Sequence, residues 1–243
     1  MAERNASVAI VGAGDFIGSA IARRFAAEGY RVHLARRDGS KLAGLVDEIA
    51  AAGGQATAHS VDARKEDEVS GFLEGVNTAA PLELCVFNIG ANVNFPILDT
   101  TERVFRKVWE MACYAGFLTG REAARHLLAN GGGSIFFTGA TASLRGGSGY
   151  AAFAAAKFGL RGLAQSMARE LGPKNIHVAH LVIDSPVDTA WVRERIAQSS
   201  GAEVPQEQLM NPASIAETYW QLHRQPRDAW THELDLRPFG ETW

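Results

Sequence analysis

The stretch SVAIVGAGDFIG, residues 7–18, decides the fold of this chain. An apolar, β-branched run over residues 7–11 predicts a buried strand, and the glycines that follow predict a tight turn. Apolar residues at Ile17, Ile21 and Phe25 then predict a helix. A second strand-like run, residues 31–35, follows at the distance that a β-α-β unit requires. The N-terminal region therefore predicts the first unit of a parallel sheet.

The glycine turn also predicts a binding site. Glycines such as Gly12, Gly14 and Gly18 let backbone amides approach a pyrophosphate, and the N-terminus of the next helix presents unpaired N–H groups and a positive dipole end. Glycine-rich loops also arise by chance, but here the strand before the turn and the helix after it supply the expected context. The turn therefore favours a dinucleotide as ligand.

Two arginines follow the second strand, where the adenosine ribose of such a ligand would lie. Arg36 and Arg37 can hold a 2′-phosphate, which favours NADP over NAD. The alternative is that both are ordinary surface arginines. Asp15 in the turn argues the other way, because a carboxylate near the 2′-phosphate would repel it.

Strand and helix patterns alternate over the rest of the chain. Further strands are predicted over residues 56–61, 82–87, 134–138, 176–183 and 233–236, and helices over 42–49, 69–76, 101–128, 151–171 and from Asn211-Pro212 onward. This alternation predicts an α/β fold: a Rossmann-like, doubly wound, seven-stranded parallel sheet with helices on both faces. No linker interrupts it, so residues 1–243 are expected to form a single dinucleotide-binding domain.

Composition narrows the choice of partners and location. The net charge of −3 and the pI near 6.2 give no reason to expect nucleic acid or an anionic membrane. Neither a signal segment nor an apolar run of about 18 residues is found, and Cys85 and Cys113 form no C-x-x-C pair. We therefore expect a cytoplasmic protein without disulfides. A metal site is not expected, because His177 and His180 would point to opposite faces of their strand.

The helix predicted after residue 150 carries a candidate catalytic pair. With about 3.6 residues per turn, Tyr150, Phe153 and Lys157 are expected on one helical face. A nearby ammonium favours tyrosinate and so lowers the pKa of a tyrosine, which suits proton transfer. The pair therefore predicts acid–base chemistry, although an isolated lysine on a helix is more often a solvated surface group.

At this point the chain resembles the short-chain dehydrogenase/reductase family over nearly its whole length. The resemblance rests on four places: Gly12-Ala-Gly14-Asp-Phe-Ile-Gly18, Asp62, Asn88-Ile-Gly90, and Ala154-Ala-Ala-Lys157-Phe-Gly-Leu. It implies that NAD(P) lies across the carboxyl ends of the strands. The implied cofactor-binding residues are Gly12, Gly14, Phe16, Ile17, Gly18, Arg36, Arg37, Asp62, Ala63, Asn88, Gly90, Lys157 and Thr189.

The resemblance also implies particular roles and a quaternary structure. Asp62 would hold adenine, Asn88 and Gly90 would line the ribose path, Lys157 would bind the nicotinamide ribose, and Thr189 would contact the nicotinamide amide. Residues 188–212 resemble the family's mobile lid over a small-molecule substrate. The tail, residues 230–243, is rich in aromatic side chains and is expected to pack between subunits of a homodimer or homotetramer.

The chain departs from the family at its catalytic positions. Phe153 stands where the family has its catalytic tyrosine, Ala140 where it has serine, and Cys113 where it has the helix asparagine. Phe16 replaces the middle glycine of the turn. Ile183-Asp184 stands where the family usually has a Pro-Gly pair after the sixth strand. Asp184 is either a cap of this loop or a functional group that acts as a base or binds an amine.

Tyr150 supplies an alternative to the missing tyrosine. Its spacing to Lys157 matches the family's divergent enoyl reductases, which transfer hydride to a C=C bond conjugated to a carbonyl. Three hypotheses follow. The first is an NADPH-preferring oxidoreductase that uses Tyr150 and Lys157 on a C=C, C=N or C=O group. The second is a non-catalytic NADP-binding sensor or partner subunit, and the third is a carbonyl reductase with a relocated tyrosine.

Overall fold

The computed structural model describes residues 4–14, 16–200 and 203–241. Within them, seven strands form one fully parallel sheet in the order β3-β2-β1-β4-β5-β6-β7. The strands are β1 (Ser7–Val11), β2 (Arg31–Arg36), β3 (Gln55–Ser60), β4 (Leu82–Phe87), β5 (Gly133–Thr138), β6 (Ile176–Ile183) and β7 (Glu233–Leu236). The predicted fold class is confirmed, and the strand order reverses between β1 and β4, where such sheets bind ligands.

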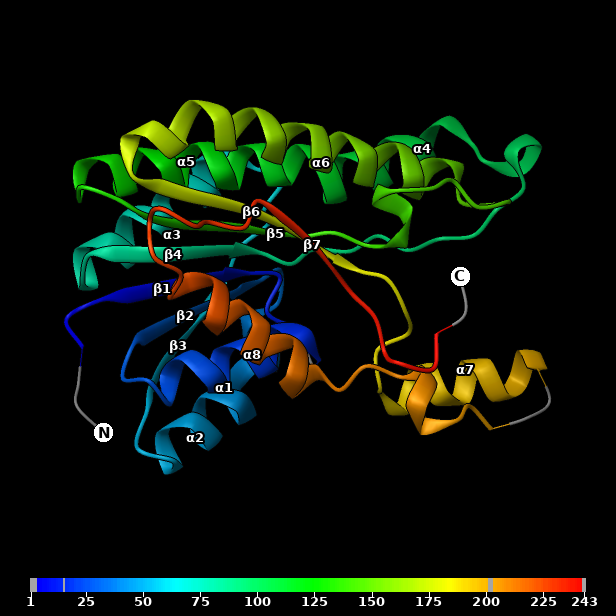
Figure 1. The fold of residues 1–243 in the computed structure, drawn as a ribbon, viewed down its shortest axis with the longest axis horizontal. Coiled ribbons are helices and arrows are strands. Elements are labelled where there is room, and N and C mark those ends of the chain that lie inside the picture. Colours follow the sequence, from blue (N-terminus) through cyan, green and yellow to red (C-terminus); the bar gives the residue numbers. More distant parts are fainter. Residues whose placement is uncertain (1–3, 15, 201–202, 242–243) are drawn as a thin grey trace.

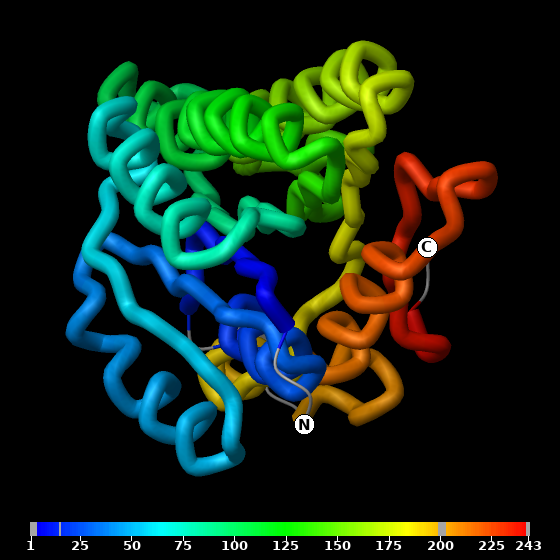
Figure 2. Tube along the Cα trace, turned by 90° about the vertical axis from the view of Figure 1, so that its left-hand side faces the viewer, coloured from blue at the N-terminus to red at the C-terminus, as the bar shows by residue number. Residues whose placement is uncertain are grey.

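Helices cover both faces of the sheet (Figures 1 and 2). One face carries α1 (Ile17–Ala26), α2 (Ala43–Ala51) and α8 (Pro212–His223), and the other carries α3 (Glu66–Ala79), α5 (Ala115–Ala129) and α6 (Ala151–Leu171). Two further helices, α4 (Glu102–Trp109) and α7 (Ala190–Ser200), lie toward the right of Figure 1. These two helices therefore extend past the sheet instead of covering its centre.

Each face of the sheet has its own apolar core. On the α1 and α8 face, Phe25 and Trp220 meet edge to face with ring centroids 5.4 Å apart. On the α5 and α6 face, Phe87, Phe137 and Leu160 are fully buried. All five residues of β1 are buried, as expected for the central strand of a sheet covered on both sides.

The helix predicted over residues 101–128 is not continuous. A π-helical turn, Glu110–Tyr114, separates α4 from α5. Cys113 in this turn packs against α6 at Gly159, where an added Cβ would lie 2.8 Å from the Cys113 sulfur. Such wide turns often mark functional sites, and this one is the position where the family has an asparagine. Helical periodicity could not reveal it, because the apolar spacing runs through the turn.

α6 has the predicted bounds, residues 151–171. Tyr150 precedes the helix as its N-cap, with backbone angles φ −105° and ψ 19°. After Leu171 the chain continues through a short 3₁₀ turn, Gly172–Lys174, and leaves it at Asn175 with a left-handed φ of 67°. The Gly-Pro pair therefore loosens the helix, while Asn175 ends it.

The C-terminal part agrees with the predicted helix start. The Asn211 side chain accepts a 2.8 Å hydrogen bond from the backbone N–H of Ala213, and Pro212 is the first helical residue. Before it, Val187 and Met210 pair as an isolated β-bridge that closes the base of the segment carrying α7. No helix in the described part of the chain is long and apolar enough to cross a membrane.

Candidate active site

The glycine turn after β1 is fixed against the end of β4. Gly12 has a φ of +93°, and a Cβ at this position would lie 2.8 Å from the backbone carbonyl of Asn88. The Asn88 side-chain amide in turn donates a 3.1 Å hydrogen bond to the Gly12 carbonyl oxygen. A Cβ on Gly18 would lie 2.8 Å from that same oxygen, whereas the space around Gly14 is open. Gly12 and Gly18 are therefore required by packing, and Gly14 leaves room for a ligand.

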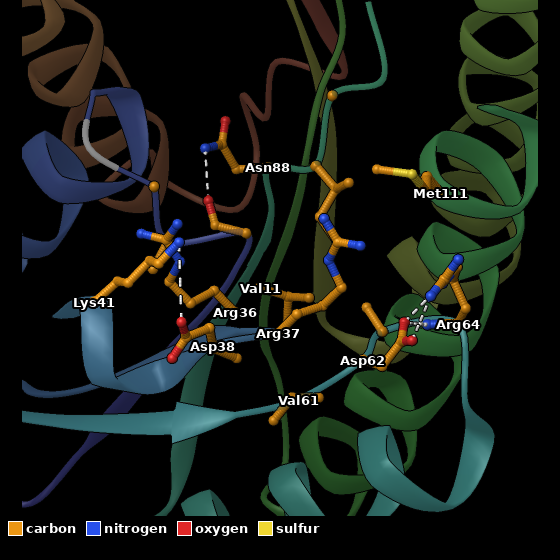
Figure 3. Close-up of a pocket in the computed structure, with 17 residues that line it drawn as sticks. Val11, Arg36, Arg37, Asp38, Lys41, Val61, Asp62, Arg64, Asn88 and Met111 are labelled. Carbon is orange, nitrogen blue, oxygen red and sulfur yellow. Dashed lines mark hydrogen bonds and ion pairs between the residues drawn. The ribbon is translucent and has the colours of Figure 1, made fainter. Parts of the chain in front are cut away.

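A first cavity of about 500 Å³ crosses the carboxyl ends of β1 to β4 (Figure 3). The predicted residues that line it are Gly12, Gly14, Arg36, Arg37, Asp62, Ala63, Asn88 and Gly90. Its position at the point where the strand order reverses is the expected one for a nucleotide.

This first cavity has basic walls. Arg36, Arg37 and Lys41 line it, and Lys41 lies 3.9 Å from the Asp38 carboxylate (Figure 3). Sequence analysis did not single out Lys41, although it is the third basic residue within the short segment after β2. Asp15, weighed there as a source of repulsion, lies outside the described residues.

Asp62 is already engaged by a neighbour. The Arg64 guanidinium donates to both carboxylate oxygens of Asp62, at 2.8 and 2.6 Å, and holds the pKa of that carboxyl below its usual value. Arg64 also lines the first cavity, opposite Arg36 and Lys41 in Figure 3. The oxygens that the resemblance assigns to adenine are therefore shared with an arginine that sequence analysis missed.

A second cavity of about 270 Å³ continues the first. The two share Gly12, Gly14, Asn88, Ile89 and Gly90 in their linings. The second cavity is further lined by the predicted residues Phe16, Ile17, Gly18 and Lys157. Together the two form one groove along the edge of the sheet, from the basic end after β2 to the lysine on α6.

Lys157 is buried at the far end of this groove. Its ammonium donates hydrogen bonds of 2.7 Å to the carbonyl of Thr138 and 3.2 Å to that of Ile89. Burial lowers the pKa of Lys157 to about 8, because the charged form loses its hydration and these two acceptors are neutral. A buried ammonium held by neutral carbonyls is not the solvated surface group of the alternative interpretation.

A third cavity, of about 620 Å³, adjoins the second. Ala140, Phe153 and Ile183 belong to the linings of both. The third cavity is also lined by Tyr150 and, from the segment that resembles the lid, by Trp191, Val192 and Ile196 of α7. It is the natural place for a substrate, because it opens from the lysine end of the groove.

Tyr150 and Lys157 line adjoining cavities. Of the second and third cavities, Tyr150 lines the third and Lys157 the second, whereas Phe153 lines both. The Lys157 ammonium lies 5.9 Å from the centre of the Phe153 ring. Tyr150 is the N-cap of α6, and its carbonyl accepts a 2.8 Å hydrogen bond from the N–H of Ala154.

Asp184 lies at the floor of the third cavity and is only 1% exposed. Its carboxylate accepts a 2.8 Å hydrogen bond from Arg237 and a 3.4 Å one from Arg145. Burial alone would raise the pKa of Asp184, but hydrogen bonds from Thr141 and Arg237 and the two arginine charges hold it below its usual value. Sequence analysis missed both arginines, because their sequence positions are far from Asp184.

Thr189 and the aromatic tail, expected at the cofactor and between subunits, make contacts within their own chain. Thr189 is buried, and its hydroxyl accepts a 3.1 Å hydrogen bond from the N–H of Val192, but it lines none of the three cavities. In the tail, Trp230 stacks on His177 of its own chain with ring centroids 4.9 Å apart, so it is not an exposed ring. Phe239 is 92% exposed, and Trp243 lies outside the described residues. Among the described residues no group of three or more His, Cys, Asp or Glu could hold a metal ion.

Comparison with known proteins agrees with this geometry. Residues 6–200 match the sequence profile of the family described as short chain dehydrogenase. The 3-oxoacyl-[acyl-carrier-protein] reductase MabA of Mycobacterium tuberculosis (strain ATCC 25618 / H37Rv) is 30% identical over 214 residues, 86% of this chain and 82% of that protein.

Solved structures give the same result. The crystal structure of a short-chain dehydrogenase from Rhodopseudomonas palustris is 60% identical, with a TM-score of 0.85 over 97% of this chain and 100% of that one. A metagenomic short-chain oxidoreductase in complex with NADP is 27% identical, with a TM-score of 0.81 over 97% and 98% of the two chains. Together with the groove and its lysine, these similarities show that the chain belongs to the short-chain dehydrogenase/reductase family.

Proposed function

We propose that this member of the family is an NADPH-preferring oxidoreductase that transfers hydride to a C=C, C=N or C=O group of a small organic substrate. The observation that carries the proposal is the series of three adjoining cavities: a basic one, a central one with buried Lys157, and a larger one with Tyr150. In this order, the three cavities suit the adenosine end of the cofactor, its nicotinamide end and the substrate.

The residues present fit a dinucleotide. The Gly12–Asn88 contact opens the turn at Gly14 for a pyrophosphate, and a Cβ at Gly12 would break that contact. Arg36, Arg37 and Lys41 suit a 2′-phosphate, because an arginine guanidinium binds phosphate through paired hydrogen bonds. We infer the preference for NADPH over NADH from this basic end.

Three side chains of the protein have separate roles in this reaction. Bound NADPH supplies the hydride, which adds to one atom of the substrate double bond. The Tyr150 hydroxyl donates the proton that the other atom needs, and Lys157 holds the nicotinamide ribose by its ammonium. Phe153 lies between them and excludes water from the place where the two cavities meet.

Two alternatives have observations of their own. The separation of Tyr150 from Lys157 by Phe153 favours a non-catalytic NADP-binding protein. The similarity to a mycobacterial 3-oxoacyl reductase favours a carbonyl reductase with Tyr150 as its relocated tyrosine. The three proposals share the cofactor groove and differ in what happens in the third cavity.

Cofactor titration followed by a substrate panel separates them. We expect NADPH to bind at micromolar concentration and more tightly than NADH, and to be oxidised by members of a panel of paired enones, ketones and imines. Binding without turnover of any panel member would support the non-catalytic protein. Turnover of ketones alone would support the carbonyl reductase. Absence of binding of either nucleotide would exclude all three.

We also propose that the protein is cytoplasmic and forms a homodimer or homotetramer. Cys85 and Cys113 are both free and buried, which suits a reducing cytosol. Exposed aromatic rings at Phe105, Trp109 and Phe117, on and beside the π-helical turn, suit a homodimer or homotetramer. Light scattering of the purified full chain tests the assembly.

A further inference from the structure

The guanidinium of Arg145 lies at the wall of the substrate cavity, next to buried Asp184. We propose that Arg145 binds a carboxylate group of the substrate, so that the protein acts on small carboxylic acids. This inference rests on the proposed function, because it names the substrate class of the same cavity.

The buried Asp184 carboxylate lies closer to Arg237 than to Arg145. It is 1% exposed and accepts a 2.8 Å hydrogen bond from the Nε of Arg237, a side chain of the tail after β7. Thr141 donates a further hydrogen bond to it. A buried carboxylate needs one such cation, and Arg237 supplies it at close range. Arg237 also donates a 2.9 Å hydrogen bond to Asp235, and of the two arginines that contact Asp184 it is the closer one.

Arg145 itself contacts Asp184 less closely. Its closest approach to Asp184 is 3.4 Å, at the long end of hydrogen bonding, and its side chain is 53% exposed. A guanidinium carries five N–H donors in a planar fork that matches a carboxylate. Asp184 thus orients one edge of this fork and leaves the rest facing the cavity.

Two further charged side chains line the cavity. Arg195 of α7 is one of them, with its guanidinium 5.2 Å from the centre of the Trp191 ring. The other is the carboxylate of Glu241, which accepts a 2.9 Å hydrogen bond from Ser185. The lining therefore carries two arginines and two carboxylates, and each carboxylate has a hydrogen-bond donor other than Arg145.

The rest of the lining describes the remainder of the substrate. Tyr150, Phe153 and Trp191 present aromatic surface to the cavity, and Phe153 also lines the adjoining second cavity. A substrate whose carboxylate meets Arg145 would lay an apolar or aromatic body along these rings. Its reducible group would then lie near Phe153, where the second and third cavities meet.

A binding experiment tests the carboxylate without requiring hydride transfer. Benzoate and benzamide have nearly the same shape and differ in charge. Calorimetric titration of each into the full chain therefore measures how much the charge contributes to affinity. The titrations are made with saturating NADP⁺ and, separately, without nucleotide. We expect benzoate to bind at least about tenfold more tightly than benzamide to the wild-type protein. Equal affinities, or no benzoate binding up to about 10 mM, would overturn the proposal.

Variants assign the effect to one side chain. Arg145→Gln should reduce the preference for benzoate to about twofold or less, whereas Arg145→Lys should keep part of it, because the charge remains and the fork is lost. The matched control Arg227→Gln removes an exposed arginine away from the cavity and should leave the preference unchanged. Loss of the preference in Arg195→Gln but not in Arg145→Gln would also overturn the assignment.

The outcome separates this inference from the proposed function. NADPH oxidation with neutral ketones or enones but not with their carboxylic acid analogues would refute the anionic substrate and leave the oxidoreductase intact. Conversely, a preference for benzoate that depends on Arg145, in a protein that binds no nucleotide, would support the anion site and refute the oxidoreductase.

Discussion

The ammonium of Lys157 lies 2.7 Å from the carbonyl oxygen of Thr138, the last residue of β5. A second bond, of 3.2 Å, joins it to the carbonyl of Ile89, just after β4. One side chain from α6 thereby links the ends of two neighbouring strands at the far end of the groove. The cost of burying its charge makes its protonation state sensitive to pH near neutrality.

Nucleotide affinity should therefore depend on pH. Burial lowers the pKa of Lys157 to about 8, so the ammonium is mostly charged at pH 7 and mostly neutral at pH 9. We expect NADPH affinity to fall by about tenfold over this range, since a charge-assisted hydrogen bond is lost. Fluorescence titrations at pH 7, 8 and 9 measure it, and Lys157→Met should bind weakly with no such dependence. A wild-type affinity that stays constant from pH 7 to 9 contradicts the prediction.

The contribution of Lys157 to the stability of the nucleotide-free protein should increase with pH, whereas nucleotide affinity decreases, and it should do so over a higher range of pH. Because the folded-state pKa of Lys157 is depressed, the unfolded chain binds more protons between about pH 8 and 10.5. The contribution of Lys157 to the free energy of unfolding therefore becomes more favourable as pH rises through that range. This trend distinguishes loss of nucleotide binding from general unfolding at high pH.

Removing the hydroxyl of Tyr150 tests its role as proton donor. Tyr150→Phe should lower the rate of hydride transfer by about 10²-fold or more, in the range expected for loss of a general acid, with NADPH affinity unchanged. Single-turnover kinetics of NADPH oxidation measure it. Tyr114→Phe is the matched control, because Tyr114 stacks on Trp109 outside the substrate cavity. A loss of less than about fivefold, roughly 1 kcal/mol, would remove Tyr150 from this role.

The basic end of the groove predicts nucleotide selectivity. Arg37→Gln should weaken NADPH binding by about tenfold and leave NADH binding nearly unchanged, because the guanidinium is proposed to contact only the 2′-phosphate. Competitive titration of the two nucleotides gives both affinities, with Arg227→Gln as the charge-matched control. An equal loss for NADPH and NADH would mean that Arg37 contacts a group common to both.

The fold could be predicted because its signals are local. The strands over residues 7–11, 82–87, 176–183 and 233–236 have the predicted bounds in the structure. The first three are mostly apolar segments, and the last alternates acidic residues with leucines. The groove follows from the fold, since glycines and basic residues after β1 and β2 must lie at one edge of a parallel sheet.

The substrate cavity could not be predicted, because it depends on long-range pairs. Asp184 meets Arg145 and Arg237 across 39 and 53 positions of the chain, and no periodicity links them. The bounds of the helix beside this cavity, by contrast, agree with the predicted range of residues 151–171, and Tyr150 is the residue just before it.

Buried histidines should make the protein sensitive to acid. Burial lowers the pKa of His33, His180 and His223 to about 4 each, so they are neutral in the folded protein and take up protons near pH 6.5 when the chain unfolds. The unfolded state therefore binds more protons between pH 6.5 and 4, and the free energy of unfolding should decrease as pH falls through this range, by at most about 1.4 kcal/mol per pH unit for each histidine.

Urea unfolding at pH 4.5, 5.5 and 6.5 measures this slope. Paired carboxylates such as Asp62 and Asp184 have depressed pKa values, so their stabilisation is lost mainly at lower pH than this range. His33→Gln removes one of the three groups and should reduce the slope. A free energy of unfolding that is constant between pH 6.5 and 4.5 would contradict the burial of these rings.

Two glycines of one turn should respond differently to the same substitution. Gly12→Ala places a side chain at a φ of +93° and 2.8 Å from the Asn88 carbonyl, so it should destabilise the protein by at least about 1–3 kcal/mol. Gly14→Ala meets open space, so its effect on stability should stay within about 0.5 kcal/mol. Because Gly14 lines the groove shared by the first two cavities, the added methyl should weaken NADPH binding without lowering Tm. Thermal unfolding and nucleotide titration of the two variants distinguish a glycine required by packing from one that leaves space for the ligand. A loss of stability in Gly14→Ala equal to that in Gly12→Ala would refute the distinction.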